Sequence, residues 1–205
     1  MKRVLLSLFA ILLVSLSFAQ TVERLTDYED NLFGKKVYVS SDYETLKAVR
    51  RLWTQESIRL RSSNYEFAQC GNSDAVLKVT IPSRLLFQQG DSVLSQTADG
   101  ILRPFLRMLR GDQAVATLVI ACYSDNNGSE KYLNHITTLR ANAIARWVQK
   151  QGMSARDVSA YGMANNVPKT DNSSLAKRER NRRVTLYLVP NRRMLRNIKR
   201  GSLFN

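Results

Sequence analysis

Asp125 and Arg140 are the two residues of this 205-residue chain whose types and spacing point most directly to chemistry. Asp125 lies in the loop-forming run Ser-Asp-Asn-Asn-Gly, and Arg140 follows fifteen residues later on a helix that we expect over about residues 130–150. Ile136 and Ile144 lie one turn before and after Arg140, so its guanidinium is drawn towards the apolar side, where it needs an anion. An acid and a base at one pocket mouth suit a ligand that carries both an amine and a carboxylate. From these residues alone, a purely structural Asp–Arg pair is the simpler explanation.

The other reactive side chains do not assemble into a recognisable catalytic or metal site. One histidine and two cysteines are too few for a structural zinc site of the usual four-ligand kind. The serines of the Asp125 loop lack a neighbouring base. Asp125 and Glu130 resemble the carboxylate pair of a glycosidase, but Arg140 would keep Asp125 ionised, which is the wrong state for a general acid. We therefore expect a protein that is not an enzyme and needs no cofactor or metal.

The first residues have the layout of a secretory signal. The basic start Lys2-Arg3 precedes an apolar and hydroxyl run over residues 4–18, and Ala19 is the small residue at the expected cleavage point. The run is shorter than the roughly 20 residues that a membrane-spanning helix needs. Since no cysteine lies near the cut to carry a lipoprotein anchor, we expect residues 1–19 to be removed. The mature chain would act in the periplasm and could associate there with the outer membrane.

The net charge narrows the choice of partners. It is +14 for the whole chain, and loss of Lys2 and Arg3 leaves +12. In a cytosolic protein this would indicate nucleic acid, whereas an exported protein meets anionic lipids and cell-wall carboxylates instead. We therefore expect no nucleic-acid partner. The tail, residues 191–205, interleaves basic and apolar residues, and it either lies on an anionic membrane surface as an amphipathic helix or frays into solvent.

Alternating strand and helix patterns organise residues 74–190 into one domain. Strands are expected at about 75–81, 115–123, 158–162 and 183–189, and helices at about 96–110, 130–150 and 174–180. This order predicts an α/β fold of the α+β type: a two-layer sandwich with a mixed four-stranded sheet, helices on one face and βαβαβαβ order. Pro104 allows a kink in the first of these helices. Residues 20–73 form a short accessory segment whose main element is a helix over about residues 41–61.

The two cysteines leave two alternatives open. Cys122 lies near the end of an expected strand, and Cys70 lies in a loop just before another. In an oxidising compartment they can form a disulfide. Otherwise they are two small buried hydrophobic residues.

Three motifs occur in order along the domain, with Gly162 and Asn172-Ser173 between the second and the third. They are Tyr123–Ser129 (YSDNNGS), Ile136–Ala141 (ITTLRA) and Arg178–Val184 (RERNRRV). Together they resemble the OmpA-like domain, the C-terminal peptidoglycan-associating module of outer membrane protein A, which also occurs in Pal-type lipoproteins and flagellar stator proteins. The family pattern reads roughly HTDxxG, LSxxRA and GRAxNRRV, and the resemblance covers about residues 74–190.

The resemblance implies a domain that binds the diaminopimelate of peptidoglycan stem peptides without covalent chemistry. Asp125 would receive the ammonium group of the ligand, Arg140 its carboxylate, and Arg182 would supply a second cationic contact. Three more motif residues complete the expected site: Tyr123, Asn126 and Asn181. Several positions depart from the family pattern: Cys122 and Tyr123 for glycine and histidine, Leu133 and Gly90 for asparagines, and Lys177 and Glu179 for glycine and alanine. We therefore expect the ionic core of the site to persist while its neutral rim, and with it the selectivity, is altered.

Two functions are compatible with these observations. In the first, the protein binds the peptidoglycan stem peptide and anchors an envelope protein or complex to the cell wall. In the second, it is a structural subunit of a membrane-associated envelope complex, with the OmpA-like domain as a scaffold of weak or altered wall binding. The accessory segment would then contact outer-membrane or other envelope proteins.

Overall fold

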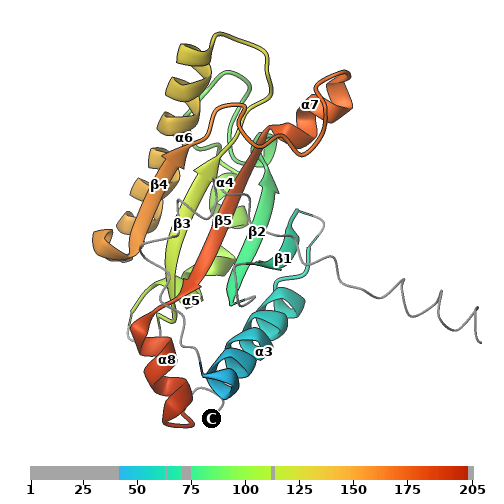
Figure 1. Ribbon diagram of the computed structural model, residues 1–205. Helices are drawn as coiled ribbons and strands as arrows, with labels where there is room; N and C mark the ends of the chain where they lie inside the picture. The colour runs from blue at the N-terminus through green and yellow to red at the C-terminus, as the bar shows by residue number, and fades with distance from the viewer. Residues whose placement is uncertain (1–41, 63, 71–74, 112–113, 203–205) are drawn as a thin grey trace, which may run out of the picture.

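The computed structural model describes residues 42–62, 64–70, 75–111 and 114–202, and its centre is a mixed sheet of five strands in the order β1-β2-β5-β3-β4 (Figure 1). The strands are β1 (Glu66–Cys70), β2 (Val76–Pro82), β3 (Ala116–Cys122), β4 (Val158–Gly162) and β5 (Arg183–Pro190). β3 and β4 are parallel, and the other pairs are antiparallel. The predicted fold class is confirmed, but the prediction of four strands was wrong by one, because β1 adds an edge strand beside β2.

The helices begin and end close to where the apolar periodicity predicted. They are α3 (Tyr43–Arg59), α4 (Ala98–Leu102), α5 (Leu106–Leu109), α6 (Glu130–Lys150), α7 (Leu175–Asn181) and α8 (Arg192–Lys199). The helix expected over residues 96–110 is divided by a 3₁₀ turn at Arg103–Phe105, which contains Pro104, a residue that lacks the N–H a continuous helix needs. Among the described residues, none of the helices is long and apolar enough to cross a membrane.

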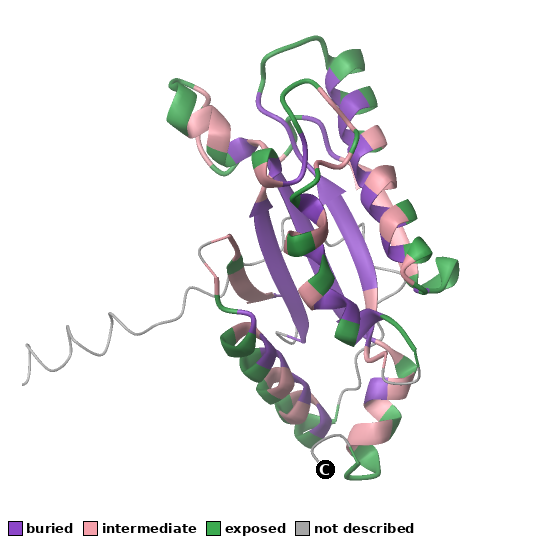
Figure 2. Cartoon of the chain, turned by 180° about the vertical axis from the view of Figure 1, so that it is seen from behind, coloured by how far each residue is buried: buried purple, intermediate pink, exposed green. Residues whose placement is uncertain are grey.

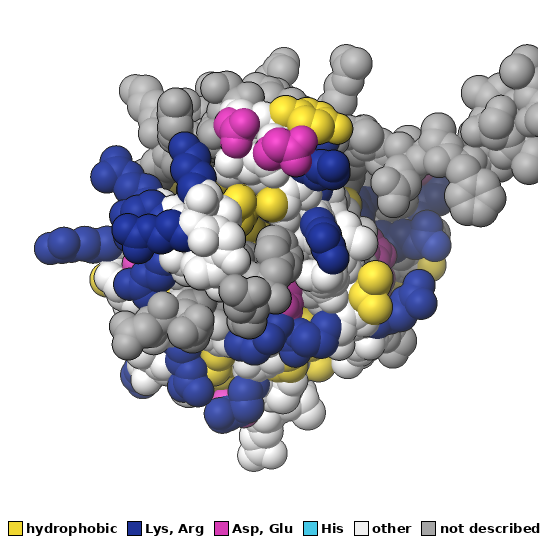
Figure 3. All heavy atoms as spheres, turned by 90° about the horizontal axis from the view of Figure 1, so that it is seen from below, with side chains coloured by type: hydrophobic (Ala, Val, Ile, Leu, Met, Phe, Trp, Pro, Cys, Tyr) yellow, Lys and Arg dark blue, Asp and Glu magenta, His cyan; other side chains and the backbone are white. Residues whose placement is uncertain are grey.

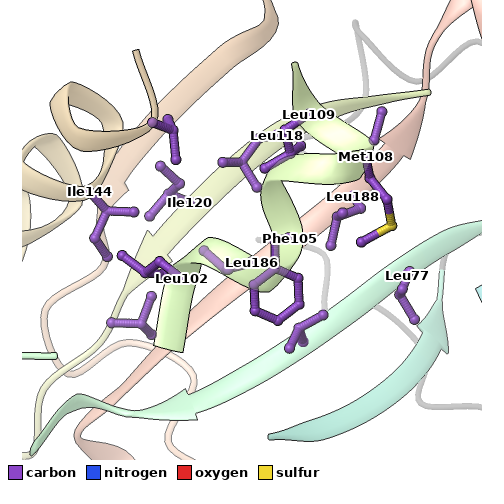
Figure 4. Close-up of a cluster of buried hydrophobic side chains, with 14 of the residues drawn as sticks. Leu77, Leu102, Phe105, Met108, Leu109, Leu118, Ile120, Ile144, Leu186 and Leu188 are labelled. Atoms are coloured by element: carbon purple, nitrogen blue, oxygen red, sulfur yellow. The ribbon is translucent and has the colours of Figure 1, made fainter. Parts of the chain in front are cut away.

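The main core lies between one face of the sheet and helices α4, α5 and α6. Apolar side chains of β2, β3 and β5 alternate towards this face, and Phe105 and Met108 pack into them (Figure 4). Figure 2 shows the consequence for burial: the central strands are buried, whereas the outer faces of the helices are exposed. The opposite face of the sheet carries a smaller cluster that includes Cys70, Tyr123 and Tyr187.

The accessory segment packs on the domain through α3 and β1. Trp53 of α3 is fully buried, and its indole nitrogen donates a hydrogen bond to the carbonyl oxygen of Ala75, 2.7 Å away. Val49, one turn earlier, belongs to the same core as β2 and β5. Asp42 caps the helix by accepting a hydrogen bond from the Thr45 main-chain nitrogen at 3.0 Å. Residues 42–62 and 64–70 therefore pack as part of the same unit as the sheet. The expected signal segment, residues 1–19, lies outside the described residues.

Helix α8 lies beside α3 at the end of the molecule seen in Figure 3. Met194 is fully buried, and Leu195 and Ile198 pack against the main core, so the apolar side of this helix is already used within the fold. The described tail therefore forms a helix rather than a frayed terminus. Its cations are exposed at this end of the molecule, where Figure 3 shows many Lys and Arg side chains: Arg192, Arg196, Lys199 and Arg200.

The two cysteines form no disulfide. Cys70 ends β1, Cys122 ends β3, and strands β2 and β5 lie between them. Cys70 also belongs to the smaller cluster, on the face of the sheet opposite α4, α5 and α6, whereas Cys122 belongs to the main core. Since a disulfide needs Cα atoms within about 7 Å, the sheet itself keeps the two thiols apart.

We expect a thiol reagent to label neither cysteine in the native protein at about pH 8 and both in denaturant without reductant. Cys70 and Cys122 are at most 1% exposed, and burial raises the pKa of the Cys122 thiol to about 12 despite the nearby Arg140 guanidinium. Because folding raises this pKa, the thiol's contribution to stability is complete below about pH 9 and is lost as the pH rises towards 12. The absorbance after addition of Ellman's reagent gives the number of labelled thiols. Fewer than two labelled thiols in the denatured protein would reveal a disulfide and contradict this arrangement.

Candidate functional site

A cavity of about 410 Å³ opens at the end of the sheet where β2 and β3 finish and β5 begins. Three segments converge there because β5 runs antiparallel to both neighbours: Pro82 pairs with Arg183, and Cys122 pairs with Val184. The loop after β2, the loop after β3 and the residue before β5 therefore meet at one edge. The first turns of α6 line the remaining side through Tyr132, Leu133 and Ile136.

Asp125 lies in the wall of this cavity and is 5% exposed. One of its carboxylate oxygens accepts a hydrogen bond from the Asn127 main-chain nitrogen at 3.1 Å, which shapes the loop after β3. The other accepts from the Arg182 guanidinium at 2.5 Å. The sequence suggested Arg140 as the structural alternative partner of Asp125, but the ion pair joins Asp125 to Arg182.

Arg182 stands between two carboxylates. Besides Asp125, its guanidinium donates two hydrogen bonds to Glu179, at 3.0 and 2.5 Å. Burial alone lowers the pKa of Arg182, but the carboxylates of Glu179 and Asp125 outweigh burial, so that its pKa is raised. Arg84 lies 3.3 Å from the second oxygen of Glu179. The charges Arg84, Glu179, Arg182 and Asp125 therefore form one chain of alternating sign along the cavity wall.

Arg140 lines the same cavity from α6 and is 7% exposed. Its guanidinium donates to the carbonyl oxygens of Asp91 and Gln88, at 2.7 and 3.3 Å, and to the Ser83 hydroxyl at 3.4 Å. It also lies 5.2 Å above the Phe87 ring. Burial lowers its pKa, although an arginine stays protonated at neutral pH. Since its hydrogen-bond partners are neutral groups, Arg140 adds positive charge to the cavity while it holds the loop after β2 in place.

The structure does not place the other three predicted site residues in the cavity wall. Tyr123 faces the opposite side of the sheet because side chains alternate along a strand, and its ring is stacked 3.7 Å from the Arg183 guanidinium. Asn126 is exposed in the loop after β3 and does not line the cavity. Asn181 is fully buried and exchanges hydrogen bonds with Thr170, at 2.8 and 3.0 Å. Asn181 therefore fixes the end of α7, next to Arg182, and acts as a positioning residue.

Several wall residues were missed because they follow β2, far from the motifs in sequence. These are Ser83, Arg84, Phe87 and Gln88. Glu179 was noticed only as a departure from the family pattern, although it carries the central negative charge of the wall. The antiparallel pairing of β2 with β5 places the loop after β2 next to Arg182.

The arrangement suits binding better than catalysis. Two carboxylates and three guanidinium groups line a space of about 410 Å³, so both poles of a zwitterion find a complementary charge. Both carboxylates form ion pairs with Arg182, so the charges of the wall are held in place by one another. Within the described part of the chain, no group of three His, Cys, Asp or Glu side chains could hold a metal ion.

Known proteins resemble this chain in sequence. A profile of the OmpA family matches residues 86–182. Among characterised proteins, the outer-membrane lipoprotein YfiB of Pseudomonas aeruginosa is 34% identical over 68 residues, which cover 33% of this chain and 40% of that protein. The match therefore spans less than half of that relative.

Two solved structures share the fold. A putative MotB-like protein from Desulfovibrio vulgaris superposes with a TM-score of 0.59 at 21% identity, covering 72% of this chain and 93% of that one. The cell wall anchor of the T6SS from Pseudomonas aeruginosa superposes with a TM-score of 0.55 at 19% identity, covering 69% and 97% of the two chains. At these identities the likeness concerns the fold.

Proposed function

Residues 86–182 form an OmpA-like domain, and on this premise we propose that the protein binds peptidoglycan without chemical turnover and thereby anchors an envelope component to the cell wall. The ligand is the diaminopimelate-type zwitterion of the stem peptide. Asp125 receives its ammonium group, and Arg140 and Arg182 receive its carboxylate. The observation that carries the proposal is a cavity lined by side chains of both charges.

The proposal places the mature chain in the periplasm, where peptidoglycan is accessible. The apolar start of the sequence supports export. The relatives support the same compartment: one is named an outer-membrane lipoprotein, and another is described as a cell wall anchor.

We expect Asp125→Asn to weaken binding to purified sacculi at least about tenfold. The change preserves the shape of the side chain but removes the charge that would hold the ligand ammonium, and a charge-assisted hydrogen bond contributes about 1.5–3 kcal/mol. The measurement is co-sedimentation over a range of sacculus concentrations, with circular dichroism to show that the fold persists.

Asp157→Asn is the matched control for this experiment. Asp157 is exposed just before Val158, the first residue of β4. Val158 pairs with Leu118 and the last residue of β4, Gly162, pairs with Cys122, so Asp157 lies at the end of β3 and β4 away from Asp125. Its binding should equal that of the wild type. Equal binding by the wild type and Asp125→Asn would refute the assigned site, and a wild type that does not bind sacculi would refute the proposed function.

A wild type that does not bind sacculi would favour the second function, a scaffold subunit in an envelope complex. The exposed cations of α8 and of α3 support that alternative, because they lie at the opposite end of the molecule from the cavity (Figures 1 and 3). This end would then contact an acidic partner protein or an anionic membrane surface.

A further inference from the structure

A second and larger cavity, of about 800 Å³, lies on the face of the sheet opposite α4, α5 and α6, beside α7 and the loop of residues 167–170. Six cations line it: Lys78, Arg84, Lys169, Arg180, Arg182 and Arg183. Two carboxylates, Glu66 and Glu179, also line it. Six positive and two negative side chains leave an excess of four positive charges, so this basic groove is built to receive anionic groups.

The floor of the basic groove contains two cations that are almost fully buried. Lys78 of β2 is 5% exposed and Arg183 of β5 is 4% exposed. The Arg183 guanidinium carbon lies over the Tyr123 ring, 3.7 Å from its centroid, and the Lys78 ammonium lies 5.9 Å from the centroid of the Tyr187 ring. Aromatic faces stabilise cations in this geometry. Positive charge is therefore fixed in the floor of the groove by the sheet and does not depend on mobile surface side chains.

One wall of the basic groove is held in a strained conformation. Val167 has φ +52°, a backbone region that β-branched residues rarely adopt. Its carbonyl oxygen accepts a hydrogen bond from Arg183 at 2.8 Å, so the buried cation of the floor fixes the strained wall. Such strain persists where the surroundings impose it and is concentrated at ligand sites.

The basic groove continues into the smaller cavity. Arg84, Glu179 and Arg182 line both spaces, and Glu179 joins the two arginines at 3.3 and 2.5 Å. A peptide whose zwitterionic end enters the smaller cavity would therefore lie over this shared wall and extend along the groove.

We propose that the basic groove binds the free carboxylates carried elsewhere on the same wall peptide, and so selects peptides with ionised over amidated carboxyl groups. This inference rests on the proposed function of the smaller cavity. The cations come from separate segments (β2, the turn after it, the loop at 167–170, α7 and the start of β5), which suits carboxylates spaced along a chain. The two acids among them disfavour a uniform polyanion. Arginine forks also match the planar geometry of a carboxylate.

The test compares two soluble wall peptides by calorimetry. Both carry an unmodified diamino-acid zwitterion, but in one the remaining carboxyl groups are amidated. The wild type should bind the free-carboxylate peptide roughly tenfold more tightly. The double variant Lys169→Gln/Arg180→Gln should lose this preference and bind the amidated peptide like the wild type, because neither residue lines the smaller cavity.

The control is Arg146→Gln/Arg156→Gln, which removes the same charge at two exposed positions outside the basic groove and should keep the preference. A groove variant that keeps the preference, or a wild type that binds both peptides equally, would overturn the inference and leave the proposed function standing. A wild type that binds neither peptide would overturn both the inference and the proposed function.

Discussion

Replacing Gly162 with alanine should lower the free energy of unfolding by about 3 kcal/mol, the largest effect on stability that we expect from a single methyl group. Gly162 is the last residue of β4, and a Cβ atom there would overlap the main-chain nitrogen and the hydroxyl oxygen of Thr138 and lie 2.8 Å from the Thr137 hydroxyl. These obstacles belong to α6. Because one of them is backbone, the overlap can be relieved only by moving the helix away from the strand.

The same shift would reach the candidate site. Thr137 accepts a hydrogen bond from the Ala164 nitrogen at 3.2 Å, and it precedes Arg140 by one turn of α6. Urea unfolding followed by tryptophan fluorescence measures the loss, which corresponds to a fall in Tm of about 6–12 °C for a chain of this size.

Gly100→Ala is the matched control. Gly100 lies within α4, and a Cβ atom there would have nothing within 4 Å. Because alanine favours a helix over glycine by up to about 1 kcal/mol, this variant should be as stable as the wild type or slightly more so. If both alanine variants unfolded at the same urea concentration, the close approach of β4 and α6 would be refuted.

The central elements of the fold were predictable because their signals are local. The near-continuous apolar run before Asp125 and the alternating run after Arg182 gave β3 and β5 to within one or two residues. β1 was not predictable in this way. Its sequence, EFAQC, is short and only partly apolar, and its burial is mostly intermediate. The strand exists because β2 offers it an antiparallel partner, which is a non-local cause.

The sequence predicted three charged residues of the candidate site but not how they pair. Asp125, Arg140 and Arg182 line one cavity, as the resemblance to the OmpA-like domain implied. Asp125 pairs with Arg182 because the Arg140 guanidinium binds the loop after β2 instead. No local sequence pattern predicts that this loop lies against α6. Tyr123 is a different case. Strict alternation after Cys122 would have placed its ring on the face of the sheet opposite α4, α5 and α6, away from the cavity.

The largest effect on binding should come from Arg140→Met, which we expect to weaken sacculus binding about a hundredfold. Two losses combine. The ligand carboxylate loses its charged partner, and the loop that carries Gln88 and Asp91 loses the guanidinium that both carbonyl groups accept from. Each loss contributes about one factor of ten, since a hydrogen bond to a charged group is worth about 1.5–3 kcal/mol.

Stability should fall by no more than about 2 kcal/mol in this variant. Methionine replaces much of the apolar stem, and the carbonyl group of Gln88, an exposed residue, can bind water instead. Hydrogen exchange of the amides in residues 86–91 measures how far the loop opens. Arg146→Met, which makes the same change at an exposed position of α6, should alter neither binding nor exchange.

Arg140→Lys separates the two roles of this residue. Lysine keeps the charge but lacks the planar fork that reaches Asp91 and Gln88 together, so the loop should open while the charge towards the ligand remains. If Arg140 acts both on the loop and on the ligand, binding by Arg140→Lys should lie between that of the wild type and that of Arg140→Met. Binding as weak as that of Arg140→Met, with equally fast exchange, would show that Arg140 acts only by holding the loop, and would leave Arg182 and Arg84 to bind the ligand carboxylate.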